Sequence, residues 1–139
     1  MDLKKIKKYA MPALAVFVAI TIFDMVFHNI IMEKMYTQHA NLFRPHNIIC
    51  THKYYFWMAN LIYSFAFCYI YSKGHEKIDS ISQGIRFGLW VTLLIWIPNT
   101  IVDYTVYAHP RSLEIAWLAG DTIQSILAGI TAAYMFKRK

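Results

Sequence analysis

The sequence predicts an all-α integral membrane protein, a single domain over residues 1–139 built as a bundle of four transmembrane helices. Three observations favour this fold class. The chain is 58% hydrophobic and only 16% charged, whereas about a quarter of the residues in a soluble domain are charged. Its apolar residues fall into four long segments, and its basic residues gather at the ends of those segments. We therefore expect the partner surface to be a lipid bilayer and not nucleic acid.

Each apolar segment is long enough, or nearly so, to cross a hydrocarbon core of about 30 Å at about 1.5 Å per residue. The expected spans cover about residues 10–32, 54–72, 85–107 and 113–136, and a long loop covers residues 33–53. The first apolar run is too long for the core of a cleaved signal, so we expect an uncleaved first span. Pro98 predicts a kink inside the third span.

The basic residues also predict an orientation. Four of them lie on one side of the expected membrane: Lys34, Arg44, Lys53 and Arg111. Ten lie on the other side: Lys4, Lys5, Lys7, Lys8, Lys73, Lys77, Arg86, Lys137, Arg138 and Lys139. By the positive-inside rule, both termini are expected in the cytoplasm and residues 33–53 outside. This predicts a multi-pass protein of the bacterial inner (plasma) membrane.

Each of the four spans carries polar side chains at helical spacing, so that the polar side chains of one span share one helical face. The spans contribute Thr21, Asp24 and His28; Asn60 and Ser64; Thr92, Trp96, Asn99, Asp103 and Tyr107; and Glu114, Asp121, Gln124 and Ser125. Counted from the centre of each span, Asp24, Asn60, Asn99 and Asp121 fall at one depth, in the half nearer the long loop. We expect an acidic cavity that opens outward and is closed below by apolar side chains.

Acidic side chains that crowd together within a membrane need a proton, a cation or a cationic ligand to neutralise them. We therefore expect the protein to bind a cation, metal or small polar ligand, as a minimal transporter or a sensor. The expected ligand-binding residues are Asp24, His28, Asn60, Asn99, Asp103, Asp121 and Gln124. Because four spans are few for a transporter, this hypothesis calls for a homodimer.

Three alternatives remain open. The polar groups can simply hydrogen-bond the bundle together. The chain can be an accessory subunit of a larger membrane complex, such as a respiratory one. An enzyme that uses Asp24 and His28 as an acid–base pair is the weakest of these hypotheses, and we assign no catalytic residue.

Metal-ligand residue types occur in two places. Asp24 and His28, one turn apart, predict a divalent-metal site to which Asp103 and Asp121 add carboxylates. His46, Cys50 and His52 in the long loop are a second candidate, although their spacing matches no closed zinc pattern. A haem is not expected, because His28 is the only histidine within a span.

Small residues mark spans three and four. Gly84 and Gly88 form a Gly-x-x-x-Gly pair, and Gly120, Gly129 and Ala133 give span four small-residue faces. Such faces let two helices approach closely. We expect tight packing within the bundle, with a contact to a second copy or a partner protein as the alternative.

Several short motifs resemble those of a group of small bacterial four-helix membrane proteins to which no activity is assigned. These are Phe27-His28-Asn29 with Tyr36 downstream, Leu42-Phe43-Arg44-Pro45, Gly84-Ile85-Arg86-Phe87-Gly88, and Trp117 through Gly120 with the later Gly129. The resemblance covers most of the chain and implies the four-helix topology. This sequence differs from the group in having more His and Cys in the long loop.

Overall fold

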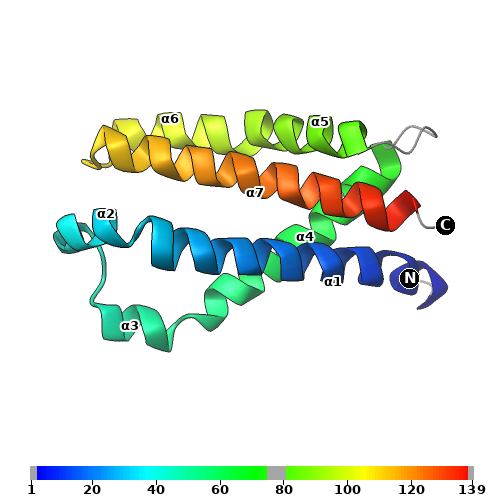
Figure 1. Cartoon of the computed structure of the whole chain (residues 1–139), viewed down its shortest axis with the longest axis horizontal. Coiled ribbons are helices and arrows are strands. Elements are labelled where there is room, and N and C mark those ends of the chain that lie inside the picture. Colours follow the sequence, from blue (N-terminus) through cyan, green and yellow to red (C-terminus); the bar gives the residue numbers. More distant parts are fainter. Residues whose placement is uncertain (1–2, 75–80, 138–139) are drawn as a thin grey trace.

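The structure is a computed structural model that describes the backbone of residues 3–74 and 81–137 and the side chains from residue 8 onward (Figure 1). All regular structure in these residues is helical, which confirms the all-α prediction. Three of the basic residues used for the predicted orientation, Lys77, Arg138 and Lys139, lie outside the described residues.

Four long helical rods account for most of the chain. The first is α1 (Leu3–Val26), which continues as a π-helical turn, η1 (Phe27–Ile31). The second is α4 (Tyr54–Gly74). The third joins α5 (Ile81–Val91), a second π-helical turn, η3 (Thr92–Trp96), and α6 (Ile97–Val106). The fourth is α7 (Arg111–Lys137).

The predicted long loop is largely helical too. It contains α2 (Glu33–Gln38), a 3₁₀ turn, η2 (Ala40–Leu42), and α3 (His46–Thr51). Pro45 precedes α3, where its fixed φ suits the entry into a helix. The short helices lie at one end of the bundle, and the start of α1 and the end of α7 lie together at the other (Figure 1). We call these the loop end and the termini end.

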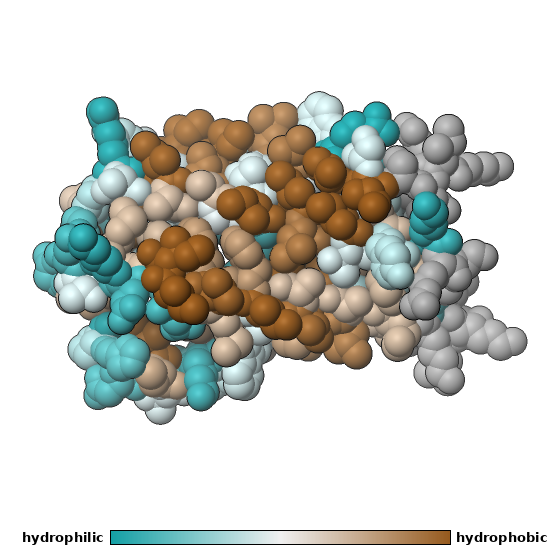
Figure 2. Space-filling model, viewed as in Figure 1, coloured by the Kyte–Doolittle hydropathy of each residue, from teal (hydrophilic) through white to brown (hydrophobic). Residues whose placement is uncertain are grey.

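Helix α7 lies between the other rods. It packs closely on α5 along one side and on α1 along the other, while α4 crosses α1 obliquely (Figure 1). Apolar side chains cover much of the visible surface of the bundle, and hydrophilic ones gather toward the loop end (Figure 2). Large exposed apolar side chains of this number are typical of a surface that faces lipid or another protein.

Three helical stretches are both long enough and apolar enough to cross a membrane: Lys8–Ile31, Ile81–Val106 and Arg111–Lys137. They coincide with the first, third and fourth predicted spans. Helix α4 has 21 residues and is therefore about 30 Å long. Its mean hydropathy falls below that of the other three, because Asn60, Ser64 and several tyrosines interrupt its apolar residues.

Glycine allows α5 and α7 to touch through their backbones. A Cβ atom added at Gly84 would overlap the carbonyl group of Gly129, and one added at Gly88 would overlap that of Ser125. The small residues thus serve packing within the bundle, as predicted.

Two apolar clusters fill the bundle, one at each end. The larger, at the termini end, comprises Ala13, Val16, Ile20, Phe67, Cys68, Tyr71, Ala128, Ala132, Ala133 and Phe136. The smaller, at the loop end, comprises Phe27, Met32 and Leu113, with Tyr36, Phe43 and Trp117 among the residues packed against it. The polar residues of α1, α4 and α7 lie between the two clusters.

Candidate acidic site

The centre of the candidate site is the carboxyl group of Asp24 on α1. Asn60 on α4 donates a hydrogen bond from Nδ2 to Asp24 Oδ2 over 2.7 Å. Gln124 on α7 donates from Nε2 to both carboxyl oxygens, at 2.9 and 3.1 Å. Residues far apart in the sequence, on three different helices, therefore meet at one carboxyl group.

A second carboxyl group, that of Asp121, lies close to the first. Asp121 is half-buried and sits one turn before Gln124 on α7, near enough to Asp24 for the two charges to repel each other. Its side chain makes no hydrogen bond within residues 8–74 and 81–137, and in the same part of the chain neither carboxyl group has an ion pair with Lys or Arg. We call Asp24, Asn60, Asp121 and Gln124 the acidic layer.

His28 lies one turn beyond Asp24, within the π-helical turn η1. Its Nδ1 is 2.6 Å from the hydroxyl oxygen of Tyr36 on α2, and the two rings stack in parallel. Trp117 on α7 donates from Nε1 to the same hydroxyl oxygen over 2.9 Å. The tautomer of His28 decides which of the two groups donates in the Tyr36–His28 bond. The histidine remains within electrostatic range of Asp24 and is the nearest basic group to the acidic layer.

Tyr36 lies outside the spanning segments and is the main polar tie between the long loop and the bundle. Burial raises the pKa of its phenol, and the hydrogen bond from Trp117 lowers it in part. The hydroxyl group therefore stays protonated near neutral pH. The sequence offered one signal for this role, namely that Tyr and Trp combine an apolar ring with one polar atom that seeks a partner when buried.

A smaller polar group lies on the termini side of the acidic layer. Ser125 Oγ accepts a hydrogen bond from Trp96 Nε1 over 2.9 Å and lies 3.2 Å from the hydroxyl oxygen of Tyr63. Ser64 turns back onto its own helix and donates to the carbonyl oxygen of Asn60. These contacts link the three long rods formed by α4, α5–α6 and α7.

The structure does not bring Asn99 and Asp103 into the acidic layer. Asn99 is exposed and Asp103 half-exposed, and neither makes a side-chain hydrogen bond within the described residues. The prediction assumed an unbroken 3.6-residue period, but the π-helical turn η3 takes up an extra residue just before Pro98, which lacks an N–H group. One extra residue turns everything downstream by about 100°, so Thr92 and Trp96 face inward and Asn99 and Asp103 do not.

The sequence did not reveal the ion pair at the start of α7. His109 Nδ1 lies 2.6 Å from Glu114 Oε1, and the Glu114 side chain is only 5% exposed. Glu114 lies in the first turn of α7, where the helix dipole also favours a negative charge. The rings of His109 and Trp117 also pack edge to face.

Neither predicted metal site forms a complete set of ligands. No three His, Cys, Asp or Glu side chains among the described residues are close enough together to hold an ion. His46 Nε2 and Cys50 Sγ on α3 are 3.3 Å apart, whereas His52 Nδ1 bonds the carbonyl oxygen of Ile48. A metal at either site remains a prediction, supported by pairs of ligands only.

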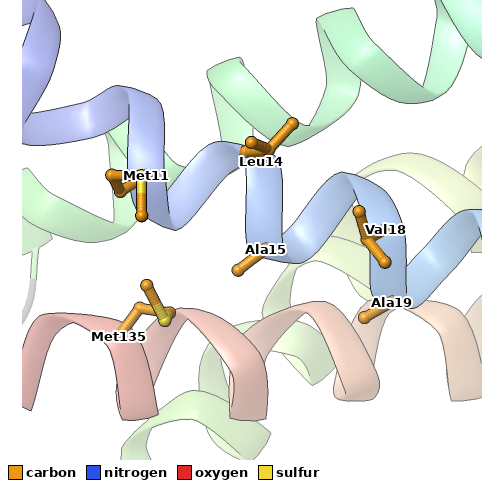
Figure 3. Close-up of a pocket in the computed structure, with 6 residues that line it drawn as sticks. All are labelled: Met11, Leu14, Ala15, Val18, Ala19 and Met135. Carbon is orange, nitrogen blue, oxygen red and sulfur yellow. The ribbon is translucent and has the colours of Figure 1, made fainter.

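Two hollows in the surface lie away from the acidic layer. The larger, of about 440 Å³, lies between α1 and α7 toward the termini end (Figure 3). The smaller, of about 220 Å³, is lined by Arg44, Ile48, Ile49, His52, Tyr55 and Phe56. Around Asp24, where the sequence predicted an open cavity, the amides of Asn60 and Gln124 donate hydrogen bonds to the carboxyl group.

Comparison with protein-family models, with curated proteins and with solved structures found no match to this chain.

Proposed function

We propose that the chain is a four-span membrane protein that binds a small cation at the acidic layer. The observation that carries this proposal is the pair of carboxyl groups, Asp24 and Asp121, close together between two apolar clusters. An ionised carboxylate within a membrane costs about 3 kcal/mol or more, and two that repel each other cost more still. A bound cation would remove both costs.

The two carboxyl groups would have different roles. Asp24 is held in place by the amides of Asn60 and Gln124, so its oxygens are fixed and partly compensated. Asp121 lacks such donors in the described part of the chain and is free to contact a ligand. With only two acids and the nearby His28, the site suits a monovalent or organic cation better than a metal that needs three or more protein ligands.

The four-span topology belongs to the same proposal. An even number of crossings returns the chain to the side on which it began, which agrees with the start of α1 and the end of α7 at one end of the bundle (Figure 1). The excess of Lys and Arg at that end favours the cytoplasm of a bacterial cell as the side that holds both termini. Residues 33–53 would then face outward.

Carbodiimide labelling tests the cation site. A hydrophobic carbodiimide reacts with protonated carboxyl groups in membrane proteins, and mass spectrometry identifies the residue modified. We expect Asp121 to react in the purified protein and to be protected when one of a panel of cations (Na⁺, K⁺, Mn²⁺ or tetramethylammonium) is added.

Two variants make the labelling decisive. Asp24→Asn should abolish the protection of Asp121, whereas Asp103→Asn, a matched change outside the acidic layer, should preserve it. If no cation of the panel protects Asp121, or if protection survives in Asp24→Asn, the proposal is wrong.

A second candidate function is that of a subunit in a homodimer or a larger membrane complex. It is favoured by α6, which has no buried residue and carries the polar Asn99 and Asp103 at the depth of the spans. Polar side chains at that depth are normally covered by protein. Cross-linking through a cysteine placed at Val102, an exposed position on α6, would identify such a neighbour; a chain that stays monomeric without any cross-link would count against this function.

A further inference from the structure

The larger hollow in the surface, between α1 and α7, shares no residue with the acidic layer and has a distinct chemistry. It is lined by Met11, Leu14, Ala15, Val18 and Ala19 of α1 and by Met135 of α7. Ala15, Ala19 and Met135 point toward the space between the two helices (Figure 3). Its volume of about 440 Å³ falls within the range of ~300–1,000 Å³ typical of small-molecule sites, and its lining is apolar.

The length and position of this groove favour a lipid chain over a protein helix. From Met11 to Ala19 it extends about 12 Å along α1, which is less than the roughly 15 Å thickness of one leaflet's hydrocarbon. Both helices belong to stretches long and apolar enough to cross the membrane, so the groove opens onto lipid. A transmembrane helix from a partner would need a groove that runs through both leaflets, whereas an acyl chain needs a groove in one leaflet only.

Positive charge lies at the mouth of the groove. Lys8 is exposed and precedes Met11 by one turn, on the same helical face as Ala15 and Ala19. Lys137 is exposed two residues after Met135, so it lies at the same end of the bundle but on the other face of α7. Long lysine side chains reach the headgroup level while their stems stay along the apolar surface. A ligand that fits this arrangement has an apolar chain and an anionic head.

We propose that the groove between α1 and α7 is a binding site for one anionic phospholipid of the leaflet that meets the termini end. One acyl chain would lie over Ala15 and Ala19, and the phosphate group would contact Lys8. The site is independent of the cation site proposed above, because the two share no residue.

Native mass spectrometry of the purified chain in mild detergent tests the site. Phosphatidylglycerol and phosphatidylcholine with identical acyl chains are titrated separately, and bound lipid is counted. A lysine at an anionic headgroup contributes roughly a fivefold gain in affinity, so we expect one phosphatidylglycerol to bind about fivefold more tightly than phosphatidylcholine. Equal affinity for the two lipids would overturn the proposal.

Paired variants separate the head site from the chain site. Lys8→Gln should lower the affinity for phosphatidylglycerol to that for phosphatidylcholine, whereas Lys34→Gln, at the loop end, should leave it unchanged. Ala15→Leu with Ala19→Leu should fill the groove and lower the affinity for both lipids at least tenfold. Ala59→Leu with Ala66→Leu, at exposed positions of α4, should leave the affinity for both lipids unchanged.

Two results would contradict the proposed binding of an acyl chain in the groove. One is full lipid affinity in the Ala15→Leu, Ala19→Leu variant. The other is a wild-type dimer that this variant dissociates, which would make a second copy the occupant. If the leucines prevent folding, Lys8→Gln decides, because it leaves the lining of the groove intact.

Discussion

At the scale of single residues, glycine determines how closely two helices of this bundle can approach. Gly84 and Gly129 face each other so closely that a Cβ atom at either one would meet the backbone of the other. Gly74, at the end of α4, is different, since a Cβ atom there would have nothing within 4 Å. The three glycines thus provide a test of packing and a control within one chain.

We predict that Gly84→Ala lowers the stability of the protein by about 1–3 kcal/mol, because the obstacle is backbone and cannot rotate away. Thermal unfolding in detergent, followed by circular dichroism, should show a clear fall in Tm. Gly74→Ala should leave Tm unchanged or raise it slightly, since alanine favours a helix over glycine. Equal Tm values for the two variants would mean that α5 and α7 do not meet at Gly84.

The residues of the acidic layer show what a sequence can and cannot place. Asp24, Asn60, Asn99 and Asp121 were expected at one depth. The structure brings Asn60 to Asp24, with Gln124 as a further partner and Asp121 within electrostatic range, and leaves Asn99 exposed. Depth follows from residue counts along each helix, which depend only on the rise of 1.5 Å per residue. Which partner each group chooses depends on rotation and packing, which residue counts do not contain.

At the scale of elements, the two π-helical turns changed what the sequence analysis expected. In the third rod, η3 turned Asn99 and Asp103 away from the acidic layer. In the first rod, η1 holds His28, whose side chain meets Tyr36 and not the carboxyl group of Asp24. Pro98 signalled an irregularity in the third span, but a proline does not specify whether the helix kinks or takes up an extra residue.

The long loop is held to the bundle mainly through α2. Tyr36 bonds His28 and Trp117, and its ring packs against the edge of Phe43. Residues 33–53 looked like a loop in the sequence because they alternate short apolar and polar stretches, too brief to show a helical period. Each of the short helices within them has no buried residue, so tertiary contacts at Tyr36 and Phe43 fix their place.

We predict that Tyr36→Phe loosens residues 33–53 without unfolding the bundle. The change removes two hydrogen bonds, each with a net contribution of about 1 kcal/mol, and leaves the Trp117 N–H group without a partner. Hydrogen–deuterium exchange should accelerate over α2 and η2 and stay unchanged over α5 and α7. Tyr107→Phe is the control, because that exposed tyrosine has no hydroxyl hydrogen bond among the described residues. Equal exchange in both variants would exclude this role of Tyr36.

At the scale of the whole molecule, hydropathy and architecture disagree on whether α4 crosses the membrane. Composition alone qualifies three helical stretches as spans, and three crossings would place the termini on opposite sides of the membrane. The fold places the start of α1 and the end of α7 at the same end, with α4 packed across α1 (Figure 1). Tyr63 and Tyr71 lower the hydropathy of α4, yet both rings pack on aromatic neighbours within the bundle. We therefore expect α4 to cross the membrane as a fourth span, with these two rings turned toward its neighbours.

The two cysteines allow a direct test of this topology. Cys50 is exposed on α3 at the loop end, and Cys68 is fully buried in the cluster at the termini end. We predict that a membrane-impermeant maleimide labels Cys50 from outside in intact spheroplasts of a bacterial expression host. Cys68 should stay unlabelled, and Cys50→Ser should remove the signal. A tag at the C-terminus should be cut by added protease only in inverted membrane vesicles.

The combination of the two readouts distinguishes the topologies. Four spans with cytoplasmic termini require Cys50 and the tag on opposite sides, with Cys50 outside. If the tag and Cys50 react from the same side, α4 does not cross, and the acidic layer would lose the transmembrane setting that makes Asp24 and Asp121 costly. If they lie on opposite sides but Cys50 reacts only in inverted vesicles, the bundle has four spans in the reverse orientation. The acidic layer would then lie in the cytoplasmic half of the membrane, and the cation site would draw its ligand from inside the cell.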